Sequence, residues 1–258
     1  AVDHHTVWVN SKALELAGIT KQTPDPTGGT IARRSDGTPK GTLREPTAMA
    51  LILDLAPADS IQSDVAAIKR ACAAYLEAGV TTSIDSWVEK DMAQAYLAAA
   101  KSGDLTIAMN LSFLATPSHW QEKLAEFNSL RAEFAALPNP DLVKANSIKF
   151  LADGALSAGT AALMEPYLDN PSSSGIKIWD EDELLDAVAL FDMHRYQVHI
   201  HAIGDAAVKQ ALDAIEAMIR INPRWDRRPV ITHAQLIDPV DLPRFAALGV
   251  IANFQPLW

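Results

Sequence analysis

Three residues that could bind a metal ion occupy similar places in three short apolar segments. Lys149 lies within residues 147–154, His201 within residues 198–205, and His233 within residues 230–235. Imidazole nitrogen is a good ligand for zinc and similar ions. A lysine amine can join such a site only after it loses its proton, for example as a carbamate formed with carbon dioxide. If the three side chains converge, they provide part of a metal centre.

Each of these segments has the pattern of a buried parallel strand. The segments are short, rich in β-branched or apolar residues, and bounded by turn residues. Parallel strands in one sheet or barrel end at the same edge, and ligand sites gather there. The pattern therefore predicts that Lys149, His201 and His233 meet, although they are far apart along the chain.

Helical and strand-like segments alternate from about residue 61 to the end of the sequence. Further strands are predicted near residues 80–85, 105–111 and 250–255, and helices near residues 64–78, 90–102, 118–136, 181–195, 206–220 and 239–247. This alternation is typical of an α/β protein with a parallel sheet. The glycine-rich fingerprint of an open dinucleotide-binding sheet is absent. We therefore predict a (β/α)8 TIM-barrel type that is incomplete here, with about six parallel strands.

Residues 1–60 differ in character from the rest of the sequence. A short helix is predicted to begin at Asn10 or Ser11 and to end at Gly18. Residues 30–34 and 40–43 flank Asp36-Gly37, which favours a β-hairpin. Residues 47–55 have a helical pattern. We interpret residues 1–60 as an inserted lid and residues 61–258 as the barrel.

The composition narrows the classes of partner. The chain has 258 residues, 48% of them hydrophobic, and a formal net charge of −10. That is enough apolar sequence for a large core. The acidic balance argues against nucleic acids and against anionic membranes. No apolar run is long enough to span a membrane, and one cysteine permits no internal disulfide. We expect a small-molecule substrate and a cytoplasmic protein. A homodimer and a periplasmic location stay open, because no native N-terminus is evident.

Six segments in a fixed order resemble the motifs of amidohydrolase family 3, the YtcJ-like branch of the metal-dependent amidohydrolase superfamily. They are residues 3–14 (DHHTVWVNSKAL), 41–45 (GTLRE), 148–154 (IKFLADG), 201–205 (HAIGD), 232–235 (THAQ) and 255–256 (QP). The resemblance covers nearly the whole chain.

The resemblance implies a distorted (β/α)8 barrel that holds one or two divalent metals, expected to be zinc. It implies hydrolysis of a carbon–nitrogen bond other than a peptide bond. The strands seen here would be barrel strands two to seven, with Lys149 as a carboxylated bridging ligand and His201 and His233 as further ligands. The first-strand His-x-His and the eighth-strand aspartate, which is the proton shuttle of the family, have no match in residues 1–258. We interpret the chain as a piece of a longer enzyme.

Other residues are candidates for supporting roles. Two aspartates just past their strands could orient the metal ligands or cap the following helices, and four residues are candidate substrate contacts. The aspartates are Asp153 and Asp205, and the substrate candidates are His5, Glu45, Trp87 and Trp258. His199, two residues before His201, is interpreted as a core histidine one layer deeper in the barrel.

Two alternatives stay open on the sequence alone. The chain could be an inactive barrel fragment without a complete metal site. It could also belong to a metal-free barrel enzyme in which Lys149 forms a Schiff base. Lys149 could also be an ordinary lysine that reaches solvent or pairs with Asp153.

Overall fold

The fold is built around a six-stranded parallel sheet that curls into half of a barrel. The computed structural model describes residues 5–57, 60–117 and 119–255. The strands follow one another in the order β4 (Thr82–Val88), β5 (Ala108–Leu114), β6 (Val143–Leu151), β7 (Gln197–Ala202), β8 (Val230–His233) and β9 (Ile251–Asn253). Each strand pairs in parallel with the next. This order is the one expected for successive strands of an α/β barrel.

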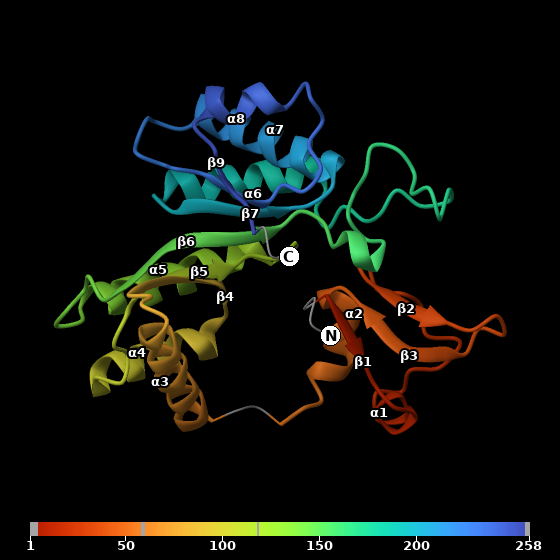
Figure 1. The fold of residues 1–258 in the computed structure, drawn as a ribbon, viewed down its shortest axis with the longest axis horizontal. Helices are drawn as coiled ribbons and strands as arrows, with labels where there is room; N and C mark the ends of the chain where they lie inside the picture. Colours follow the sequence, from red (N-terminus) through yellow and green to blue (C-terminus); the bar gives the residue numbers. More distant parts are fainter. Residues whose placement is uncertain (1–4, 58–59, 118, 256–258) are drawn as a thin grey trace.

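Helices connect the strands and cover one face of the sheet. They are α3 (Ile61–Glu77), α4 (Lys90–Ser102), α5 (Trp120–Ala135), α6 (Glu181–Met193), α7 (Asp205–Ile221) and α8 (Leu242–Leu248). In Figure 1, α6, α7 and α8 lie above the curled sheet, and α3 and α4 lie at its lower left. The short 3-10 helix η1 (Leu156–Ala158) follows β6.

Aromatic side chains fill the layer between the sheet and the helices. Phe113 of β5 stacks on Phe127 of α5, with ring centroids 4.9 Å apart. Phe150 of β6 meets Phe191 of α6 edge to face at 6.0 Å. Successive side chains of a strand point to opposite faces. The residue before Phe150, Lys149, therefore lies on the inner face of the half-barrel, away from the helices.

The N-terminal part of the chain forms a separate antiparallel sheet. Its order is β1 (Thr6–Trp8), β3 (Pro39–Arg44), β2 (Thr30–Arg33), and it is accompanied by α1 (Ser11–Leu16) and α2 (Pro46–Leu53). In Figure 1 this subregion, in red and orange, lies apart from α3 to α8. Gly41 has a φ of +87°, and a Cβ there would lie 2.2 Å from the Val9 carbonyl oxygen. A glycine is therefore required where β3 passes the end of β1.

The predicted fold class is confirmed, and some boundaries are corrected. Strands β4 and β5 begin and end two to three residues later than the predicted segments 80–85 and 105–111. For the start of β5, the reason is that Leu105 and Ile107 are apolar and buried although they lie in the connection that precedes the strand. The predicted hairpin is β2 and β3, whereas the pairing of β1 with β3 was not predicted. In the described ranges, none of the helices has both the length and the apolar character that a bilayer crossing needs.

Candidate active site

Lys149, His201 and His233 come from three neighbouring strands of the sheet. In the register, Lys149 lies opposite His199 and Leu151 lies opposite His201, so these side chains share the inner face. The rings of His201 and His233 meet edge to face with centroids 4.6 Å apart. The structure therefore brings Lys149, His201 and His233 together at the inner face of the half-barrel.

His233 reaches this place through an unusual backbone conformation. It pairs with Ala202, the neighbour of His201 that points away from the inner face. Regular alternation would therefore place His233 on the helix side. However, β8 ends at His233, where φ is +78°, and Ala234 follows with φ +43°. Non-glycine residues seldom adopt such angles unless the surrounding structure holds them there.

Lys149 is buried, and its burial disfavours the charged form of the side-chain amine. Its residue is 4% exposed, and burial lowers its pKa from 10.5 to about 7. Among the described residues no carboxylate forms an ion pair with its amine. The alternative that Lys149 pairs with Asp153 is not observed. A substantial fraction of uncharged amine is therefore present near neutral pH, and an uncharged amine is a nucleophile.

A hydrogen bond orients the His201 ring, and burial disfavours the charged form of the His233 ring. The Nε2–H of His201 donates to the Gly154 carbonyl oxygen at 3.0 Å, and Nε2 lies 3.4 Å from Asp153 Oδ1. Because a carbonyl can only accept, Nε2 carries a proton, and Nδ1 is the ring nitrogen that a metal ion would bind. Burial, then the charges of His201 and Lys149, lower the pKa of His233 to about 3. Burial thus keeps the His233 ring in the uncharged form that can offer a lone pair to a metal ion.

Asp153 organises the backbone around His201. It is fully buried, and its carboxylate accepts hydrogen bonds from the backbone N–H groups of Ala162 at 2.9 Å, Ile203 at 2.9 Å and Gly204 at 2.8 Å. These bonds tie the end of β6 to the segment that follows β7. Asp205, in contrast, accepts from the backbone N–H groups of Met164 and Ala206. The structure places Asp153 beside the imidazoles and Asp205 at the start of α7.

A histidine and a glutamate from the N-terminal subregion reach into the same site. His5 Nδ1 donates to Glu45 Oε2 at 2.8 Å, and the His5 ring centroid lies 5.1 Å from that of His201. Glu45 is fully buried, has a φ of +67°, and accepts a hydrogen bond from the Thr160 hydroxyl through Oε1. His5 and Glu45 therefore belong to the candidate site.

Gly154 and Thr160 also support the site, although neither was predicted as a site residue. The carbonyl of Gly154 accepts from His201, and the Thr160 hydroxyl accepts from the Ala155 N–H. A Cβ on Gly154 would lie 2.1 Å from Thr160 Oγ1 and 2.3 Å from Glu45 Oε1. The glycine in the predicted Asp-Gly motif was the available signal, since it marks a position where other groups approach the backbone.

His199 lies deeper on the same inner face. Its Nε2 hydrogen-bonds the Thr232 hydroxyl, and it is 4% exposed. Burial, followed by the charge of Lys149, lowers its pKa to about 2. This placement agrees with the interpretation of His199 as a core histidine.

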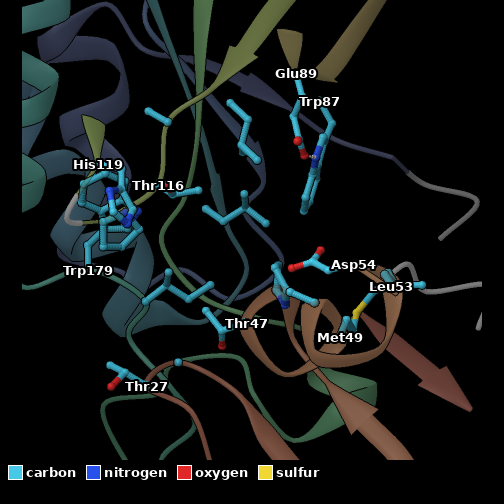
Figure 2. A pocket seen from close by; sticks show the side chains of 18 residues that line it. Thr27, Thr47, Met49, Leu53, Asp54, Trp87, Glu89, Thr116, His119 and Trp179 are labelled. Atoms are coloured by element: carbon cyan, nitrogen blue, oxygen red, sulfur yellow. Dashed lines mark hydrogen bonds between the residues drawn. The ribbon is translucent and has the colours of Figure 1, made fainter. Parts of the chain in front are cut away.

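Of the two remaining substrate candidates, the structure describes only Trp87. Trp87 is 39% exposed and lines a pocket of about 630 Å³ beside the site (Figure 2), where its Nε1–H donates to Glu89 at 3.2 Å. Trp258 lies outside the described residues.

Comparison with known proteins gives the family of the chain. The model of the amidohydrolase family matches residues 1–258. The chain belongs to the amidohydrolase family. This finding confirms the resemblance inferred from the six sequence motifs.

Several proteins are similar to this amidohydrolase family chain. LONG AFTER FAR-RED 3 of Arabidopsis thaliana is 34% identical over 99% of this chain and 44% of its own length. The YtcJ protein of Bacillus subtilis is 33% identical over 98% of this chain and 46% of its own length. N-substituted formamide deformylase of Arthrobacter pascens is 27% identical over 96% of this chain and 46% of its own length. The chain thus spans about half the length of these relatives.

Two solved structures of metal-dependent hydrolases have a fold similar to that of this chain. An uncharacterised metal-dependent hydrolase from Pyrococcus furiosus superposes with a TM-score of 0.69 and 25% identity, covering 98% of this chain and 48% of that chain. An uncharacterised metal-dependent hydrolase from Pyrococcus horikoshii has a TM-score of 0.70 at 24% identity, over 98% of this chain and 47% of that chain, which shows a shared fold.

The site of this amidohydrolase family member fits part of a metal centre. Within residues 5–57, 60–117 and 119–255, no group of three or more His, Cys, Asp or Glu side chains is arranged to hold a metal. Lysine is not one of these four residue types. His201 and His233 offer two imidazoles in mutual contact, and Lys149 lies on the same inner face, opposite His199 in the register. These three residues would hold the ion.

Proposed function

We propose that this chain carries part of the reaction centre of a metal-dependent hydrolase that cleaves carbon–nitrogen bonds other than peptide bonds. The substrates would be amides, formamides or cyclic amides. One observation carries the proposal: the imidazoles of His201 and His233 and a lysine whose burial favours the uncharged amine meet in a member of the amidohydrolase family. The similarity to an N-substituted formamide deformylase supports the choice of bond.

The roles of the residues follow from their contacts. His201, His233 and Lys149, the last as a carbamate formed with carbon dioxide, would hold one or two ions, expected to be zinc. When bound, the ion would supply a water whose pKa falls from 15.7 to roughly 7, so that it can attack a carbonyl near neutral pH. Asp153 holds the backbone around His201, and the Gly154 carbonyl fixes the orientation of that ring.

The N-terminal subregion would enclose the substrate. Its Glu45 holds His5 beside His201, so that His5 can contact a group bound next to the imidazoles. A buried carboxylate that accepts from one imidazole nitrogen fixes the ring and its tautomer. We therefore assign substrate orientation to His5 and support of His5 to Glu45.

Metal analysis of the full-length protein tests this function. We expect close to stoichiometric zinc and hydrolysis of at least one amide, formamide or cyclic amide, with activity lost on chelation and restored by added metal. The double variant H201A/H233A should lose both metal and activity. H194A is a matched control, since His194 ends α6 away from the site. Unchanged metal content in the double variant would contradict the ligand assignment. A protein without stoichiometric metal would favour the inactive fragment.

The lowered pKa of Lys149 also suits a Schiff-base mechanism. Borohydride reduction in the presence of a carbonyl substrate distinguishes the two functions. Covalent trapping at Lys149, together with activity that survives chelation, would favour the metal-free enzyme.

A further inference from the structure

A pocket beside the candidate site is formed jointly by the N-terminal subregion and the half-barrel. We call it the α2 pocket, because α2 provides one wall through Met49, Ala50 and Leu53. The opposite wall comes from Leu114, Leu151 and Trp179. Figure 2 shows Met49 and Leu53 on one side of the pocket and Trp179 across from them. Its volume of about 630 Å³ is suitable for a small organic group.

The α2 pocket adjoins the imidazoles and Lys149 through the strand register. Leu114 lies opposite Lys149 across β5 and β6, and Leu151 lies opposite His201 across β6 and β7. Residues that lie opposite one another share a face of the sheet. A group that extends from a substrate at His201 toward β5 would therefore enter this pocket.

The charged residues of the α2 pocket are of one sign, apart from a histidine. Asp54 and Glu89 line it, as does His119, and no Lys or Arg is among the described lining residues. Glu89 is held near the rim by the Nε1–H of Trp87, and Figure 2 shows this contact. The pocket thus combines apolar walls with two carboxylates.

A pocket with apolar walls and two carboxylates should bind the amine half of an amide better than the acyl half. Hydrolysis breaks the C–N bond, adds the water oxygen to the acyl carbon, and leaves the nitrogen with a proton. Near neutral pH the acyl product is then a carboxylate and an alkyl amine product becomes an ammonium ion. Two carboxylates attract the ammonium and repel the acid, while the apolar walls bind a hydrocarbon substituent.

We propose that the α2 pocket binds the amine half of the substrate and selects amides whose nitrogen carries an apolar group, up to the size of an aromatic ring. This inference rests on the proposed hydrolysis of amides. It assigns α2 a specificity role: the helix provides the wall against which the nitrogen substituent packs.

Two matched series of compounds test the assignment in the metal-loaded full-length protein. One series lengthens the nitrogen substituent of a formamide from methyl to butyl to benzyl, and the other lengthens the acyl group of a primary amide. We expect kcat/KM to rise up to about fourfold for each added methylene on nitrogen, and to show no such rise on the acyl side. A rise that follows the acyl side would overturn the proposal.

Two tryptophan substitutions on α2 make the test specific. A50W fills the pocket, so it should abolish the preference for long nitrogen substituents, with kcat/KM for N-benzylformamide falling to about that for N-methylformamide in the same variant. L51W is the control, because Leu51 is on the same helix but does not line the pocket. An unchanged preference in A50W would overturn the proposal.

A binding measurement separates this proposal from the proposed function. Benzylamine and phenylacetate are titrated into metal-free protein, and tryptophan fluorescence reports binding near Trp87 and Trp179. We expect benzylamine to bind, phenylacetate to bind at least tenfold more weakly, and D54N/E89Q to remove the difference. Equal binding of both compounds to wild type would overturn the proposal. If wild type binds benzylamine selectively but hydrolyses neither series, the proposed function fails and the pocket assignment stands.

Discussion

Replacing Lys149 with methionine should stabilise the metal-free protein at neutral pH. The lysine amine is buried without an ion-pair partner in the described part of the chain, and its pKa is lowered from 10.5 to about 7. Each pKa unit corresponds to about 1.4 kcal/mol, so the cost of burying the amine approaches about 5 kcal/mol. Methionine has a similar length and carries no charge.

The sign of the pH dependence follows from the two pKa values. Above pH 10.5 the amine is uncharged in both the folded and unfolded states, so it imposes no cost. As the pH falls from 10.5 to about 7, the unfolded chain takes up a proton that the folded protein does not, and the wild type loses stability. Below pH 7 the cost is constant. The advantage of K149M should therefore grow from near zero at pH 10.5 to its maximum near pH 7.

Urea denaturation followed by circular dichroism at pH 7, 8.5 and 10 measures this difference. The protein is treated with chelator and kept in buffer free of carbon dioxide. K144M is the control, because Lys144 is on the same strand and its side chain is 56% exposed. A difference between K149M and wild type that is the same at all three pH values would refute the reasoning, as would a K149M protein that is less stable at pH 7.

Three further substitutions separate the candidate site from the general fold. D153N should lower metal affinity by about 10- to 100-fold, because an amide cannot replace the carboxylate that fixes the backbone near His201; competition with a zinc dye measures this, and an unchanged affinity would contradict the role. D205A should lower the free energy of unfolding by about 1 kcal/mol, because the hydrogen bonds that Asp205 accepts from the backbone are lost, and it should leave metal affinity within twofold of wild type. A large loss of metal affinity would instead show that Asp205 supports the metal ligands. D192A leaves the buried Arg227 without its partner and should cost about 3–5 kcal/mol of stability in urea denaturation; a cost below about 1 kcal/mol would show that this ion pair is not a structural anchor.

The parallel half-barrel could be predicted because its helix-facing residues form continuous apolar patterns. Phe113 and Phe150 pack against the helices, and Phe150 lies within a segment that was predicted as a strand. The boundaries of β4 and β5 were less predictable, because the inner face carries polar residues such as Ser112, and apolar residues such as Ile107 lie outside the strands.

The convergence of the site residues was predictable only in part. The position of Lys149 and His201 follows from strand alternation and from the shared edge of a parallel sheet. His233 breaks the alternation through its positive φ, which no local pattern revealed. The Glu45–Thr160 hydrogen bond joins residues far apart in sequence and depends on how the N-terminal subregion docks. Contacts of that kind come from tertiary structure and not from periodicity.

The most direct test of the account is a crystal structure of the zinc-loaded full-length protein, with anomalous diffraction recorded at the zinc absorption edge. We predict an anomalous peak within about 2.0–2.1 Å of one ring nitrogen of His201 and one of His233, with Lys149 or its carbamate within coordination distance. An anomalous peak elsewhere in the molecule, with the two imidazoles and the lysine bound to no common ion, would contradict the account.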